Sequence, residues 1–121
     1  METLTIDRSK WRTGENGPNQ TGLGRTKLKN ERGFKCCLGF ECERIGADIG
    51  IGTSTPRGLP WGASNHLVNV GRETSNSEFT REAMDINDNE YLTPEEREAK
   101  ITAHFLTGGI QVEFINEYIK P

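Results

Sequence analysis

The sequence predicts a small single-domain α+β protein, in which a short β-sheet includes the N- and C-terminal strands and is packed by two or three helices. Three observations support this prediction. A capped helix and an alternating segment follow one another near the end of the chain, a second alternating segment lies at residues 3–7, and an apolar segment with three cysteines lies between them. Because both alternating segments are short, pairing them would tie down both termini.

The last third of the chain gives the clearest helix and strand. Thr93 is the expected N-cap, Pro94 takes the first helical position, and Glu96 stands three residues after the cap, which is the spacing of a capping box. The glycine pair at 108–109 ends the helix. Residues 110–115 then alternate apolar and polar side chains with a period of two, which predicts a half-buried strand.

Two further helices are predicted in the middle of the chain. Residues 36–44 suit a mostly buried helix that ends at Gly46, and residues 77–84 form a second candidate. The residues that follow, 85–91, are rich in Asp and Asn and are expected to connect this helix to the capped one. After the first strand, residues 7–11 predict a turn or a single helical turn.

Two Gly-rich loops interrupt these elements, near residues 13–26 and 46–66, within one domain that covers residues 1–121. Residues 66–70 also suit a brief strand. Long loops of this kind are often functional, so both are candidate binding segments.

The composition limits the class of protein. Only 32 % of the residues are hydrophobic, which predicts a small core and makes a homo-oligomer one way to gain further burial. No hydrophobic run approaches the ~20 residues of a membrane span, and the first residues lack an apolar signal-peptide core. We therefore expect a cytoplasmic protein with no membrane contact.

The net charge is −3, but the charges are unevenly distributed. Residues 8–35 hold eight Lys and Arg against two Glu, whereas residues from Gly46 onward hold six Lys and Arg against twelve Asp and Glu. One interpretation is that these are solvated faces that pair within the molecule. The other is that the basic strip binds an anion, since Gly-rich backbone beside Arg25, Lys27 and Lys29 suits a phosphate.

Loop aromatics extend this second interpretation. Trp61 lies in a loop-like setting, where it either closes an edge of the core or anchors a partner, and Arg57 and His66 are expected nearby. The candidate ligand- or partner-binding residues are Arg8, Lys10, Trp11, Arg25, Lys27, Lys29, Arg57, Trp61 and His66.

The Asp/Asn cluster is a weak candidate for a calcium site. Asp85, Asn87 and Asn89 have the spacing of EF-hand ligands, but Glu90 stands where the loop needs Gly. A turn between two helices accounts for the same residues. We therefore predict no metal and no cofactor.

The three cysteines are expected to be small buried hydrophobic residues rather than ligands or nucleophiles. Cys36 and Cys37 are adjacent, whereas paired zinc ligands usually lie two to four residues apart. Nothing near Cys42 indicates a lowered thiol pKa.

Four motifs in order along the chain resemble a group of small, uncharacterised proteins encoded by tailed phages. They are residues 4–12 (LTIDRSKWR), 36–40 (CCLGF), 86–88 (IND) and 109–115 (GIQVEFI). Residues 48–76 carry none of these motifs. The resemblance implies a phage origin and assigns no catalytic residue.

Taken together, these features favour a phage accessory protein that acts by binding in the host cytoplasm and is not an enzyme. It would inhibit or modulate a host protein, or sequester a nucleotide signal of host defence. Two alternatives stay open: a small metal-binding or hydrolytic enzyme, and a nucleic-acid-binding protein that uses residues 8–35.

Overall fold

The computed structural model describes residues 1–13, 33–46, 78–89 and 91–118. Within these ranges it contains two strands, one 3₁₀ turn and three α-helices, which confirms the predicted α+β class. In chain order the elements are β1 (Glu2–Asp7), η1 (Arg8–Lys10), α1 (Cys37–Arg44), α2 (Glu78–Asp88), α3 (Pro94–Thr107) and β2 (Ile110–Ile115).

The two terminal strands pair with each other in one parallel sheet, which confirms the predicted sheet that contains both of them. Glu2 pairs with Ile110 and the register continues without a break to Asp7 and Ile115. Leu4 and Ile6 are buried while the threonines between and beside them are exposed, and β2 alternates in the same way. One face of the sheet therefore belongs to the core and the other is polar.

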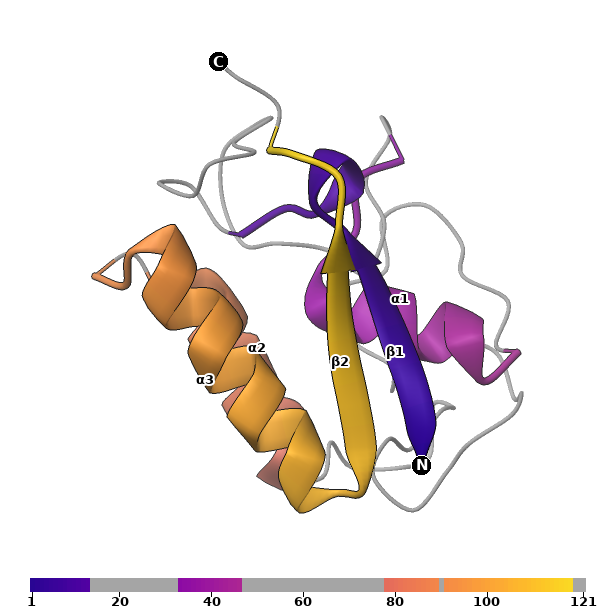
Figure 1. Cartoon of the computed structure of the whole chain (residues 1–121). Coiled ribbons are helices and arrows are strands. Elements are labelled where there is room, and N and C mark those ends of the chain that lie inside the picture. The colour runs from indigo at the N-terminus through magenta and orange to yellow at the C-terminus, as the bar shows by residue number, and fades with distance from the viewer. Residues whose placement is uncertain (14–32, 47–77, 90, 119–121) are drawn as a thin grey trace.

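The helices cover the apolar face of the sheet, and α2 lies behind α3 in the view of Figure 1, in contact with α3 and α1. The α2–α3 pair packs on the β2 side, whereas α1 contacts β1 and α2 and continues past the outer edge of β1. The core between the sheet and the helices is made of apolar side chains from every element except η1. Its fully buried large members include Leu4, Ile6, Trp11, Leu38, Ile101, Phe105 and Ile110.

The capping box of α3 forms as predicted. The Thr93 hydroxyl accepts a hydrogen bond from the backbone N–H of Glu96 at 3.1 Å, and the Glu96 carboxylate accepts one from the N–H of Thr93 at 3.0 Å. At the other end, Gly109 has a φ of 79°, which is the left-handed conformation that only glycine adopts without strain. The helix therefore stops where β2 must begin.

Helix α1 agrees with its predicted span, but α2 is longer than predicted. It runs to Asp88 and includes residues 85–88, for which we expected a connecting turn. The extension is stabilised from outside the segment, because the buried Asn87 side chain accepts hydrogen bonds from the Trp11 indole and the backbone N–H of Cys37. Long-range contacts therefore override the local turn preference of Asp and Asn.

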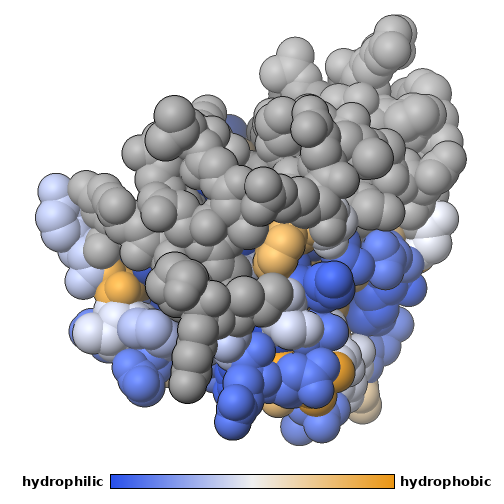
Figure 2. Space-filling view, turned by 90° about the horizontal axis from the view of Figure 1, so that it is seen from above, coloured by the Kyte–Doolittle hydropathy of each residue, from blue (hydrophilic) through white to orange (hydrophobic). Residues whose placement is uncertain are grey.

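The surface seen in Figure 2 is mainly hydrophilic where its residues are described, and apolar side chains appear there only in small separate areas. Such scattered residues do not make an apolar interaction patch on that face. None of the described helices has the length and apolar character needed to cross a membrane.

Candidate functional site

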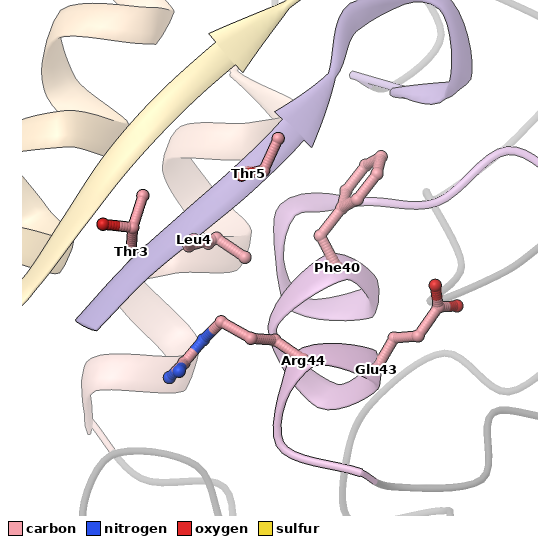
Figure 3. A pocket seen from close by; sticks show the side chains of 6 residues that line it. All are labelled: Thr3, Leu4, Thr5, Phe40, Glu43 and Arg44. Carbon is pink, nitrogen blue, oxygen red and sulfur yellow. The ribbon is translucent and has the colours of Figure 1, made fainter.

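The candidate site is an open pocket of about 260 Å³ between β1 and α1. Figure 3 shows its lining side chains, three from the strand and three from the helix. They are Thr3, Leu4, Thr5, Phe40, Glu43 and Arg44.

The strand contributes its edge, not one of its faces. Thr3, Leu4 and Thr5 are consecutive, and successive side chains of a strand point to opposite faces of the sheet. A pocket that all three of them line must therefore border the backbone. The other edge of β1 pairs with β2, and within the described ranges no strand pairs with this outer edge.

The helix contributes a platform beside that edge. The ammonium group of Lys35 lies over the aromatic ring of Phe40, with its Nζ 4.6 Å from the ring centroid. Lys35 also contacts Glu43 at 3.0 Å, although the Glu43 side chain is 56 % exposed. The platform thus combines an aromatic base with an accessible carboxylate on its rim.

Arg44 lies beside the N-terminal part of β1 and keeps spare hydrogen-bonding capacity. Its Nε donates to the fully buried Glu41 at 2.5 Å, and this hydrogen bond raises the pKa of Arg44 despite its partial burial. Nη1 has only a 3.4 Å contact with the exposed Glu2, and Nη2 has no hydrogen-bond partner in the part of the chain that the structure describes. Because Nη2 is buried, Nη1 is the group that can still donate to a further oxygen.

Arg8 was a predicted ligand-binding residue, and the structure gives it an internal role. Its guanidinium makes two parallel hydrogen bonds to Glu98, at 2.8 and 2.7 Å, and a third to the carbonyl of Asn116. It also lies over the rings of Phe114 and Tyr118, at 5.5 and 5.9 Å from their centroids. Arg8 therefore fastens α3 and the chain after β2 to η1.

The Arg8–Glu98 pair predicts a defined pH dependence of stability. Burial raises the pKa of Glu98, but the hydrogen bonds from Arg8 and Tyr118 lower it by more, so it lies below the ordinary value of 4.5. A carboxylate of this kind stabilises the fold above its unfolded pKa, and the contribution is lost as the pH falls through the folded value. We expect Glu98→Gln to be less stable than wild type at neutral pH and to approach it in acid.

Urea unfolding at several values between about pH 7 and pH 3 measures this difference. Glu95→Gln, on an exposed position of the same helix, is the matched loss of a carboxylate. If Glu98→Gln and Glu95→Gln show the same pH dependence as wild type, the ion pair does not contribute as described.

The structure also changes the roles expected for Trp11 and Asn87. Trp11 is fully buried, so it is a core residue and is withdrawn from the partner-binding set. Its indole N–H donates to the Asn87 side-chain oxygen at 2.7 Å, and the backbone N–H of Cys37 donates to the same oxygen at 3.0 Å. The Asn87 amide group donates in turn to the carbonyl of Arg12 and to Asp88.

The calcium interpretation does not fit this arrangement. The Asn87 oxygen is already used by two donors, and Asp85 is exposed on a regular helix. The Asn89 side chain accepts from the N–H of Tyr91 at 2.9 Å, which is an Asx-turn. Within the described residues no group of three or more His, Cys, Asp or Glu side chains is arranged to hold a metal ion.

The three thiols are buried, as the sequence predicts. Burial raises the pKa of Cys36 and of Cys42 to about 12, and it raises that of Cys37 well above the ordinary value. Burial therefore disfavours the thiolate, which is the reactive form, at all three positions.

The other predicted binding residues are only partly located. Lys10 is exposed, with its Nζ 5.8 Å from the centroid of the Phe34 ring. The remaining candidates, Arg25, Lys27, Lys29, Arg57, Trp61 and His66, lie outside the described residues.

Sequence reasoning did not identify the pocket residues as a site. The polar side of β1 was visible in the alternation of threonine with apolar residues, and Phe40 was correctly expected on a mostly buried helix. What no local pattern reveals is that α1 passes under β1 and extends beyond its outer edge (Figure 1).

Fold and pocket together define a small α+β protein with an open site at a strand edge. Comparison with protein-family models, curated proteins and solved structures finds no match to this chain.

Proposed function

We propose that this chain is a phage accessory protein that acts in the host cytoplasm by binding a host protein, which it inhibits or modulates. The observation that supports a binding role is the open pocket along the outer edge of β1. The phage origin rests on the resemblance of the four sequence motifs described above.

The size and shape of the pocket favour a polypeptide partner over a small molecule. Its volume of about 260 Å³ is below the range of roughly 300–1,000 Å³ that is typical of small-molecule sites. An open groove of this size suits one or two side chains of a segment whose remainder lies on the surrounding surface. Polar backbone groups at the strand edge supply hydrogen bonds that such a segment can use.

The nucleotide alternative has less support among the described residues. It requires cationic side chains that are available to a phosphate. Among the predicted residues that the structure describes, Arg8 is engaged by Glu98, and Lys10 is exposed but does not line the pocket. The other residues on which that alternative depends, Arg25, Lys27 and Lys29, lie outside the described ranges.

Capture from a lysate of the bacterial host tests the proposed function. The tagged chain is compared with Glu43→Trp, which places a bulky side chain on the pocket rim, and with Glu95→Trp on α3. The Glu43 side chain is 56 % exposed, and Lys35, which is 13 % exposed, keeps its contact with the Phe40 ring, so the replacement is expected to leave the fold intact. In Figure 1, α3 lies on the opposite side of the sheet from the outer end of α1.

The expected result is one dominant host protein, identified by mass spectrometry, that wild type and Glu95→Trp retain and Glu43→Trp loses. Thermal unfolding of both variants provides the control for folding. Turnover of a substrate at an enzymatic rate, or equal capture by all three proteins, would contradict a binding role for this pocket.

A further inference from the structure

The outer edge of β1 offers backbone groups as well as a pocket. In a parallel pair, successive residues of a strand direct their N–H and C=O groups to alternate edges, so every second residue of β1 points away from β2. Within the described ranges these groups have no strand partner. An edge of this kind is a template for an added strand.

Helix α1 completes the template from below. The helices cover the apolar face of the existing strands, and α1 continues past the edge of β1 (Figure 1). A third strand beside β1 would therefore find Phe40 and Arg44 beneath it, as Figure 3 indicates. Its inward side chains would contact the platform and its outward ones would face solvent, which is the alternation that β1 and β2 already show.

From these observations we infer that the outer edge of β1 takes up an extended segment of the partner polypeptide as a third strand, over the platform made by Phe40, Glu43 and Arg44. This inference rests on the proposed function and specifies its mode of binding. The segment carries alternating apolar residues toward α1 and one side chain with an acceptor oxygen for Arg44, whose Nη1 has only a 3.4 Å contact with Glu2.

A second copy of this chain fits the edge less well than a single segment. Consider two copies that join their β1 edges about a twofold axis perpendicular to the sheet. Each copy would then place its α1 under the β1 strand of the other. Because α1 already extends past β1 on the helical side of the sheet, the two helices would compete for one space (Figure 1). A partner that contributes only an extended segment avoids this overlap.

The test uses a displayed library of random linear peptides of about ten residues, which is enough for one strand. Peptides are selected on the wild-type chain and then measured against Glu43→Trp and Glu95→Trp. We expect the selected peptides to alternate apolar and polar residues, and to bind Glu43→Trp at least about tenfold more weakly than wild type or Glu95→Trp.

Amide hydrogen exchange by NMR then locates the contact. The expected result is new protection at alternate residues of β1 when the selected peptide is bound, with β2 unchanged because the peptide lies along the edge of β1 that faces away from β2. Peptides that bind without protecting β1 amides would overturn strand addition. Protection of β1 that rises with protein concentration and needs no peptide would overturn it in favour of self-association.

The two proposals fail separately. A host protein that is captured through the pocket but leaves β1 amides unprotected would keep the proposed function and remove the added strand. Peptides that protect β1, in the absence of any pocket-dependent host partner, would keep the added strand and remove the proposed function.

Discussion

Trp11→Ala is expected to destabilise the fold by about 4–5 kcal/mol, the upper part of the range for removing a buried aromatic side chain. Trp11 is fully buried and its ring lies 5.4 Å from that of Phe114 and 6.1 Å from that of Tyr118. Its loss removes this packing and also one hydrogen-bond donor to the buried Asn87. For a single small domain, such a change is a large fraction of the total stability.

Urea unfolding followed by far-UV circular dichroism measures this loss, since the substitution also removes a tryptophan fluorophore. Trp11→Phe is the matched control, because it keeps most of the ring packing and loses only the indole N–H. We expect it to cost about 1–3 kcal/mol. If Trp11→Ala leaves the stability nearly unchanged but abolishes partner capture, Trp11 is a surface contact and its assignment to the core is wrong.

Asn87→Ala is expected to cost about 3–4 kcal/mol, although it removes only a small polar side chain. The Asn87 oxygen accepts from Trp11 and from the backbone of Cys37, and its amide donates to the backbone of Arg12. Removing the side chain leaves these buried groups without their partner, and each such group costs more than an average hydrogen bond is worth.

Asp85→Ala is the control for this substitution, because Asp85 is exposed on the same helix. We expect it to change the free energy of unfolding by less than about 0.5 kcal/mol. Thermal unfolding with and without calcium separates the structural role from metal binding. A rise in the wild-type melting temperature with calcium that is absent in Asn87→Ala would show that Asn87 is a ligand after all.

The contrast between α3 and α2 shows which parts of the fold the sequence can predict. Helix α3 carries its own start and stop signals, since Thr93, Glu96 and Gly109 act on the backbone within a few residues. The end of α2 has no such local signal. Residues 85–89 have the composition of a turn, yet Asn87 is fixed in a helix by groups that lie 50 to 76 residues away.

The same distinction explains the candidate site. Alternation in β1 and β2 was sufficient to predict strands and to separate their core-facing from their exposed residues. Whether a given edge of β1 is open depends on which element lies beside it, and that is a property of the packing of α1. For the same reason Arg8, in a basic stretch of the sequence, was predicted to bind a ligand. Its partner Glu98 lies 90 residues away, so no local pattern indicates the pair.

Photo-crosslinking from the pocket rim tests most directly whether the edge of β1 is a binding site. A benzophenone amino acid replaces Glu43 in one protein and Glu95 in another, and each is irradiated in a lysate of the bacterial host. We predict a single covalent adduct from position 43 that is absent from position 95, attached to an extended segment of one host protein. Equal adducts from both positions, or a partner that is captured by the wild-type chain but never crosslinks from position 43, would contradict this account.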